Sequence, residues 1–500
     1  MGDRSVIIIG AGIAGLSAGC YARMNGYRSR IFEMHDHPGG LCTCWERGGY
    51  TINGCVHVLV GAGHGSPFRR IWEELGAIQG REVFFYDEFV RFEGSDGRTF
   101  ILSTNIDELE EHMLELAPDD AQLTRRFIRG VRKLTGFQAP VLRAPELYGP
   151  LSGLKLGLKM LPYAPVAHRW LRLSMREFSR RWTDPLLREA FSALWFPEVP
   201  VLMFMMTIAM LHSKRAGYPA GGSLDFSRAI ERRYLGLGGE VRYGAAVTEI
   251  LVENDRAVGV TLADGGEHRA DYVISAADGH ATTFNMLGGR YVNDRIRGYY
   301  KDLPIFPPLV YLSLGLSRSF DSMPSAATGM SIPLDTPIEI GGEQVDRLGV
   351  RVHDFDPALA PEGKTFLRVL QSATYDAWAR FESDPDGYQA EKRRITDAII
   401  AALDSRFPGL ADSVEMSDLA TPLTFRRYTG NWQGSHEGWL VTTKTWKIRM
   451  KKTLPGLDNF YMAGHWVQPG GGLPSAAMAA RNVVQLICHR DKRPFTTSTP

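Results

Sequence analysis

The 500-residue chain has few cysteines and no regular cysteine spacing. The five are Cys20, Cys42, Cys44, Cys55 and Cys488. An odd number without a repeated framework argues against a disulfide scaffold and favours a reducing compartment. Cys42 and Cys44 alone offer too few ligands for a metal site. We therefore expect a cytoplasmic protein with no metal centre.

An excess of charge and a membrane-spanning run are also absent. The 57 basic and 56 acidic residues leave a net charge of +1, so nucleic acid is not an expected partner. The longest uncharged apolar run of helical character, Val199–Leu211, contains Pro200 and falls short of the ~20 residues that cross a bilayer. The apolar start of the chain carries glycines at nucleotide-binding positions, so we expect no signal peptide there.

That start predicts a dinucleotide-binding turn. An apolar strand at 6–9 leads into Gly-x-Gly-x-x-Gly, and a helix is expected at 16–24. The motif consists of Gly10, Gly12 and Gly15. They permit a tight turn, a close approach to phosphates at a helix N-terminus, and close packing of helix on strand. A second strand at 28–32 ends at Glu33, whose carboxylate can accept hydrogen bonds from ribose hydroxyls.

Two further glycine turns point to FAD. Gly39 and Gly40 follow Glu33 and allow a second close approach of the backbone to a pyrophosphate. A glycine-rich surface loop is the alternative interpretation of these two glycines. Near the C-terminus, a strand at 459–464, a glycine-rich turn at 465–475 and a helix at 476–489 provide a second helix N-terminus. Two such units suit a cofactor with two separate ends.

Between these units the chain changes character. Helices are predicted at 106–117 and 121–135, followed by seven basic residues and one acid in 151–183. Two basic amphipathic helices there, and the Met-rich run 202–210, suggest a surface that lies on anionic lipid. A helical cap with a buried apolar face is the alternative.

Strands then return in two groups. Those at 241–243, 246–253 and 257–262 predict a small meander, and 270–278 a strand that leads back to the nucleotide fold. Strands at 306–315, 349–352 and 365–373, with a helix at 386–407, predict a second sheet. The expected fold is α/β: a discontinuous Rossmann-type FAD-binding domain, an interleaved α+β substrate domain and a helical cap that can associate with a membrane. We assign 1–105, 220–290 and 455–490 to the FAD-binding domain, 106–219 to the cap and 291–454 to the substrate domain.

Together, the motifs resemble those of the phytoene desaturase family, which includes carotenoid isomerases and retinol saturases. Besides the glycine turns, the resemblance rests on Gly-Cys-Val-His at 54–57, Val-Ile-Ser-Ala-Ala-Asp at 273–278, the segment 420–428, and Ala-Gly-His-Trp at 463–466. It implies FAD, a long apolar substrate and docking on a membrane. The cofactor-binding residues it implies are Gly10, Gly12, Ala14, Gly15, Glu33, Gly39, Gly40, Leu41, Val247, Gly464, Gly472 and Leu473.

The chain departs from the family pattern at two places. Asn53 stands where the family often has aspartate, and His465-Trp466 follow the last glycine motif where desaturases usually carry a small or acidic residue. If a C=C bond is saturated, a proton must be delivered, and the candidates are His57, His465 and Tyr428. Each could instead be a hydrogen-bonded part of the scaffold.

The sequence thus favours an FAD-dependent oxidoreductase that acts on C–C or C=C bonds of a carotenoid, retinoid or other isoprenoid lipid by hydride transfer at flavin N5. Three alternatives stay open: an amine-oxidase-like flavoenzyme, an isomerase that uses reduced flavin, and a non-catalytic carrier of prenyl groups or lipids. The sequence identifies no electron donor or acceptor. Peripheral attachment to a membrane is an alternative to a purely cytoplasmic location.

Overall fold

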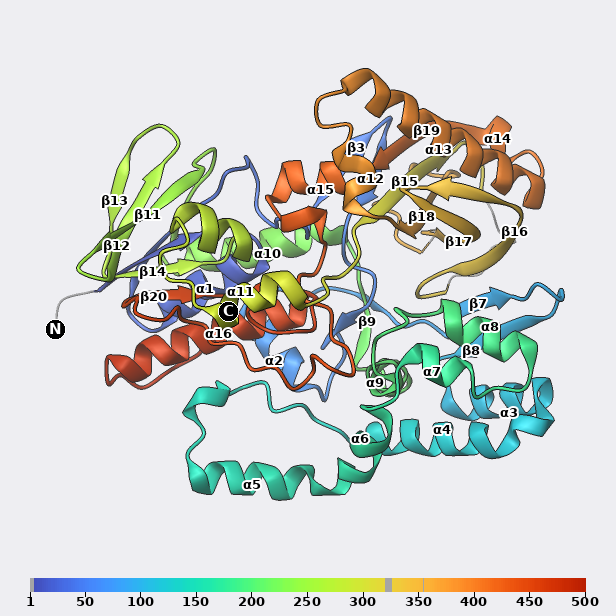
Figure 1. Ribbon diagram of the computed structural model, residues 1–500, viewed down its shortest axis with the longest axis horizontal. Coiled ribbons are helices and arrows are strands. Elements are labelled where there is room, and N and C mark those ends of the chain that lie inside the picture. The colour runs from blue at the N-terminus through green and yellow to red at the C-terminus, as the bar shows by residue number, and fades with distance from the viewer. Residues whose placement is uncertain (1–3, 320–325, 354) are drawn as a thin grey trace.

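A five-stranded parallel sheet gathers strands from three distant parts of the chain (Figure 1). The computed structural model describes residues 4–319, 326–353 and 355–500. The sheet order is β10 (Glu240–Arg242), β2 (Arg28–Phe32), β1 (Ser5–Ile9), β14 (Tyr272–Ser275) and β20 (Phe460–Met462). Every neighbouring pair is parallel. The predicted interruption of the nucleotide fold is therefore present in the sheet.

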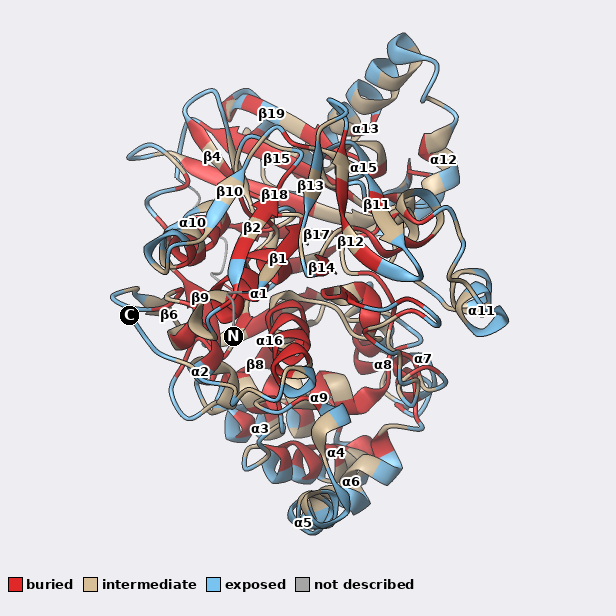
Figure 2. Cartoon of the chain, turned by 90° about the vertical axis from the view of Figure 1, so that its left-hand side faces the viewer, coloured by how far each residue is buried: buried red, intermediate tan, exposed pale blue. Residues whose placement is uncertain are grey.

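Three helices pack beside this sheet: α1 (Ile13–Met24), α10 (Gly222–Gly236) and α16 (Leu473–Arg490). The apolar side chains of β1 are buried on both faces, as expected of a central parallel strand. Figure 2 shows α16 almost entirely buried. Small residues such as Ala477 and Ala480 let α16 approach α1 closely.

A three-stranded antiparallel meander follows α10, and its make-up differs from the prediction in one strand. It consists of β11 (Val247–Glu253), β12 (Arg256–Leu262) and β13 (Glu267–Arg269). The strand expected at 241–243 is β10, which pairs in parallel with β2 at the sheet edge. Pairing partners depend on tertiary contacts, so a short strand pattern does not reveal its sheet.

The second sheet has seven strands and an α-helix on one face (Figure 1). In order, they are β19 (Val414–Ala420), β15 (Leu309–Leu316), β18 (Thr365–Ser372), β17 (Glu343–Val352), β16 (Met330–Ile340), β7 (Glu88–Glu93) and β8 (Thr99–Ser103). Ile395, Ile399 and Leu403 of α13 (Pro385–Arg406) pack on it. Although β7 and β8 fall within 1–105, β7 pairs with β16, so this stretch belongs to the seven-stranded sheet.

The remaining elements connect these two sheets. Two small sheets are formed by β3 (Cys44–Arg47) with β4 (Tyr50–Asn53), and by β5 (Leu59–Val60), β9 (Ala216–Pro219) and β6 (Val83–Phe84). Short helices are α2 (Pro67–Glu74), α11 (Asp294–Asp302), α12 (Tyr375–Ala379), α14 (Leu410–Ser413) and α15 (Pro422–Thr429).

The helical region contains α3 (Ile106–Leu116), α4 (Ala121–Leu134), α5 (Pro150–Met160), α6 (Ala164–Trp170), α7 (Met175–Ser179), α8 (Pro185–Ala193) and α9 (Val201–His212). The prediction of a lipid-facing second basic helix is wrong, because Met175, Phe178 and Trp182 are fully buried. Phe178 stacks on Phe127 at a centroid distance of 5.4 Å. The Met-rich run lies in α9, whose Phe204 and Met205 are also core residues. These segments form a packed aromatic core instead.

Helix α5 has the opposite character. It extends along the rim of the helical region (Figures 1 and 2), and none of its residues is buried. Its apolar stripe is exposed: Leu151 by 78%, Leu154 by 63%, Leu158 by 62% and the following Leu161 by 64%. Within the described residues, no helix is both long and apolar enough to cross a membrane.

Candidate cofactor site and active site

The first glycine turn has the geometry of a phosphate cradle. Gly10 has φ of +93°, and a Cβ at Gly15 would lie 1.8 Å from the Gly10 carbonyl oxygen. Gly12 precedes α1, and no side chain caps the first N–H groups of this helix. These uncapped donors, at the positive end of the helix dipole, fit a pyrophosphate.

Glu33 is buried beside this turn. Its Oε2 accepts a hydrogen bond from the Ala11 N–H at 2.5 Å, and its Oε1 accepts one from the His35 N–H at 2.9 Å. Each carboxylate oxygen keeps a lone pair for a ribose hydroxyl. Val247 begins β11, two residues after Ala245, whose N–H donates to the Glu33 carbonyl. This placement next to Glu33 fits the predicted adenine contact of Val247.

The second backbone approach is also present. The Gly39 N–H donates to the Ala11 carbonyl at 2.9 Å, and a Cβ at Gly40 would lie 3.5 Å from the Gly12 Cα. A Cβ at Gly39 would lie 2.2 Å from the carbonyl oxygen of Cys42. The loop therefore lies directly against the glycine turn, with the half-buried Leu41 following it.

The C-terminal turn meets the N-terminal turn at Ala14. A Cβ on Gly464, whose φ is +110°, would lie 3.6 Å from the Ala14 Cβ. Gly472 precedes Leu473, the first residue of α16, and no side chain caps this helix either. The C-terminal turn at Gly464 thus lies against the first glycine turn, and α16, which follows it, supplies a second uncapped helix N-terminus, as a two-ended cofactor requires.

Two of the three predicted proton donors, His57 and His465, are half-buried, and His436 acts electrostatically on both. Burial, Arg368, Arg351 and His436 all lower the pKa of His57, which lies well below its ordinary value. Burial, with a smaller effect of His436, lowers the pKa of His465 to about 4. Both imidazoles are therefore neutral at pH 7. Burial also lowers the pKa of His436 to about 4.

Tyr428 does not join this group. Its side chain is 48% exposed, and its ring lies 5.1 Å from that of His35, two residues after Glu33. This position is at the ribose end of the site, so the structure does not favour a proton-delivery role for Tyr428. His35, Asp36 and His37 bring three possible metal ligands within 4.8 Å of one another, but they are at most half-buried.

The two departures from the family pattern have structural explanations. Asn53 is buried, its Nδ2 donates to the Val56 carbonyl at 3.0 Å, and its Oδ1 accepts from the Ser223 N–H at 3.1 Å. Trp466 packs against Trp439 at a centroid distance of 5.1 Å. Asn53 thus holds the loop that carries His57, and Trp466 is a packing residue.

Glu437 is a candidate that motif reasoning missed. Its Oε1 lies 3.7 Å from the position of a Cβ at Gly472, at the start of α16. Burial raises the pKa of this carboxyl to about 7. A carboxyl with this pKa can give or take a proton near neutral pH. No sequence pattern singles out Glu437, because its proximity to Gly472 arises only from the fold.

The raised pKa predicts how stability depends on pH. Below about pH 4.5 the Glu437 carboxyl is protonated in both the folded and the unfolded chain; between about pH 4.5 and 7 the folded chain binds more protons. Its stabilising contribution is therefore lost as pH rises through 7. Urea unfolding without added cofactor should show that Glu437→Gln removes a decline on the order of 2 kcal/mol between pH 5 and 8. Glu249→Gln, at an exposed site, is the control; equal slopes in both variants would contradict the assignment.

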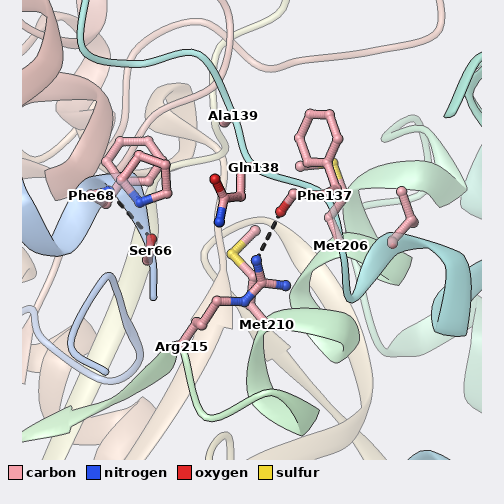
Figure 3. A pocket seen from close by; sticks show the side chains of 10 residues that line it. Ser66, Phe68, Phe137, Gln138, Ala139, Met206, Met210 and Arg215 are labelled. Carbon is pink, nitrogen blue, oxygen red and sulfur yellow. Dashed lines mark hydrogen bonds between the residues drawn. The ribbon is translucent and has the colours of Figure 1, made fainter. Parts of the chain in front are cut away.

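A small apolar pocket lies elsewhere, between α2, α4 and α9 (Figure 3). Its walls include Phe68, Phe137, Met206 and Met210. Arg215 lies at its edge and donates to the Phe137 carbonyl at 2.8 Å. None of the glycine-turn residues lines this pocket, so it is separate from the cofactor site.

The site defines a flavoprotein that holds its dinucleotide between both ends of one chain. The family model described as "Flavin containing amine oxidoreductase" matches residues 13–488, and the chain belongs to this family. FAD is its cofactor. The glycine turns and the buried Glu33 described above fit this dinucleotide.

Curated relatives extend this result over the whole chain. A prolycopene isomerase of Daucus carota is 25% identical over 95% of this chain and 78% of its own length. A lycopene-forming phytoene desaturase of Pseudescherichia vulneris is 24% identical over 97% of this chain and 99% of its own length. The predicted likeness to the phytoene desaturase family is confirmed.

Solved structures confirm the fold. An oxidoreductase of Methanosarcina mazei aligns with a TM-score of 0.58 and 19% identity over 96% of this chain and all of its own. Putrescine oxidase bound to putrescine aligns with a TM-score of 0.60 and 12% identity, over 98% of this chain and 99% of its own. At these identities the likeness shows a shared architecture only.

Proposed function

We propose that this flavoprotein acts on C–C or C=C bonds of a long apolar substrate such as a carotenoid, a retinoid or another isoprenoid lipid. The observation that carries the proposal is the full-length similarity to prolycopene isomerases and phytoene desaturases. The three candidate reactions are desaturation, saturation and isomerisation.

The side chains of the site have separate tasks in such a reaction. When bound, FAD supplies hydride transfer at N5. His57 and His465 stay neutral at pH 7, because burial lowers their pKa values. They can therefore orient groups through hydrogen bonds but do not act as protonated acids at this pH. The pKa of Glu437, raised to about 7, makes it the group best suited to deliver or accept a proton.

The amine-oxidase alternative is less compatible with the charges of the site. Arg351 and Arg368 are buried next to His57 and would repel a protonated amine. The complete set of cofactor-binding turns argues against a non-catalytic lipid carrier, because a protein that only sequesters lipid does not need a flavin.

Product analysis tests the proposal. FAD-loaded protein is incubated with phytoene or a poly-cis lycopene, with the flavin oxidised or chemically reduced, and the products are separated by chromatography. We expect a polyene that has lost or gained two hydrogens, or a changed cis–trans pattern at constant mass. Oxidation of putrescine, with every polyene returned unchanged, would instead favour the amine-oxidase alternative.

We also propose that α5 places the protein on an anionic membrane. Four exposed leucines form its apolar stripe, and Lys155 and Lys159 are exposed on the same helix. Apolar side chains flanked by lysines are the pattern of a helix that lies in the lipid interface. A membrane is also where a long apolar substrate would be met.

A further inference from the structure

Two buried arginines lie side by side in the seven-stranded sheet. Arg351 of β17 and Arg368 of β18 are direct cross-strand partners. Their exposed fractions are 1% and 3%. Like charges placed directly opposite each other on antiparallel strands destabilise the pairing, and burial makes both charges costlier. The fold therefore keeps an arrangement that is unfavourable by itself.

In the part of the chain that the structure describes, the side-chain partners of these two arginines are not carboxylates. Arg351 Nη2 donates to the Tyr86 hydroxyl, and Arg368 Nη1 donates to the ring of His57, 2.8 Å from Nδ1. The guanidinium of Arg351 also lies 5.3 Å from the Tyr86 ring centroid. Each of these partners is neutral, so neither arginine is neutralised by the group to which it donates.

The carboxylate of the nearby Asp356 already accepts hydrogen bonds from other donors. Asp356 is buried, and its Oδ2 accepts from the Tyr218 hydroxyl at 2.6 Å and from the Gly221 N–H at 3.2 Å. Its Oδ1 accepts from the Ala358 N–H at 3.1 Å. One carboxylate also balances only one of the two cations. Among the described residues, the two arginines and Asp356 leave the cluster with a net charge of +1.

Several polar atoms of this cluster have no partner among the described residues. They are the donors Nε and Nη1 of Arg351 and Nε of Arg368, and the two ring nitrogens of the buried His353. Native proteins rarely leave such atoms unsatisfied. Unpaired guanidinium donors on two facing strands can each donate a charge-assisted hydrogen bond to an oxygen of one carboxylate.

The cluster adjoins the candidate active site. Arg368 contacts His57, and Tyr311 of β15, whose ring lies 5.9 Å from the Arg368 guanidinium, donates to the Asn53 carbonyl at 2.7 Å. Phe355 and Phe366 lie against His353, with ring centroids 5.6 and 5.3 Å away. The donors are thus set in aromatic surroundings suited to an apolar chain.

We propose that Arg351 and Arg368 bind the carboxylate of a substrate whose remainder is a long apolar chain. This inference rests on the proposed function and adds to it a preference, among long apolar substrates, for those that end in a carboxylate. The carboxylate supplies the missing negative charge and the missing acceptors. It thereby fixes which bond of the chain lies at the reactive end of the site.

Two probes that differ only in their end group test this inference: all-trans-retinoic acid and all-trans-retinol. Binding to the FAD-loaded protein is followed by tryptophan quenching in chloride-free buffer. We expect the wild-type protein to bind the acid about 10- to 100-fold more tightly than the alcohol, as charge-assisted hydrogen bonds predict. Equal affinity, or no binding of the acid, would overturn the inference.

Variants Arg351→Met and Arg368→Met should abolish the preference for the acid and leave the affinity for retinol within about threefold. Without ligand, they should melt no lower than the wild type, because each removes an uncompensated buried charge. The matched control is Arg347→Met on the same strand. Arg347 pairs with Glu189 at 2.6 Å, so its loss should lower the melting temperature and keep the preference.

The outcomes separate this inference from the proposed function. If both methionine variants unfold, or if they keep the preference for the acid, the arginines are structural and the inference is wrong. If the preference depends on the arginines but no polyene is converted, the carboxylate site stands and the proposed reaction fails. If neutral polyenes are converted and the acid is not preferred, the proposed reaction stands and the carboxylate site is wrong.

Discussion

Replacing Gly15 by alanine is expected to abolish FAD binding. The new Cβ would lie 1.8 Å from the Gly10 carbonyl oxygen, which is a backbone atom of the phosphate turn. The backbone at residue 15 fixes where this Cβ lies, so the clash can be relieved only by moving the β1–α1 connection, which forms the cofactor site. The purified variant should be colourless and should regain less than about 1% of the flavin of the wild type on incubation with FAD, consistent with loss of several kcal/mol of binding energy.

Gly157→Ala is the matched control, because nothing lies within 4 Å of a Cβ at that exposed position of α5. This variant should stay yellow. A Gly15→Ala protein with full flavin content would show that the turn does not hold the dinucleotide as described. A wild-type protein that never becomes yellow would favour the lipid-carrier alternative.

Glutamine at the four exposed leucines of α5 and its end should prevent membrane binding. The substitutions are Leu151→Gln, Leu154→Gln, Leu158→Gln and Leu161→Gln, combined in one protein. Removing four apolar side chains from a lipid interface should weaken binding to anionic liposomes about 100-fold or more. Because all four are exposed, the melting temperature should change little. Flotation with liposomes containing phosphatidylserine measures the effect.

Leu235→Gln serves as the control, since Leu235 is an exposed leucine of α10, outside the stripe. It should float with liposomes as the wild type does. If the wild-type protein stays at the bottom of the gradient, or if the fourfold variant floats equally well, α5 does not attach the protein to membranes.

The cofactor turns could be read from the sequence because they depend on local backbone requirements. Only glycine accepts the φ of Gly10 or the approach of Gly15 to Gly10. Glu33 could be located because one helix and one strand, of the length usual in this motif, separate it from the glycines. The β2 strand has the bounds that its apolar pattern predicts.

What could not be predicted depends on packing between distant segments. The apolar stripes of α5 and of the stretch from Met175 to Trp182 have the same spacing, yet one is exposed and the other is core. Periodicity shows that a helix has an apolar face and does not show what covers it. Glu437 and the pair Arg351–Arg368 reach the site through tertiary contacts. A buried arginine in an otherwise apolar strand was the one signal that could have indicated the pair.

The most direct test of the central claim is anaerobic mixing of the FAD-loaded protein with phytoene and, separately, with putrescine. Flavin and polyene absorbance are recorded together, first with oxidised and then with reduced flavin. The account predicts that phytoene, or a poly-cis lycopene, changes the flavin oxidation state or its own spectrum, and that putrescine changes neither. Bleaching of the flavin by putrescine, with no response to any polyene, would contradict it.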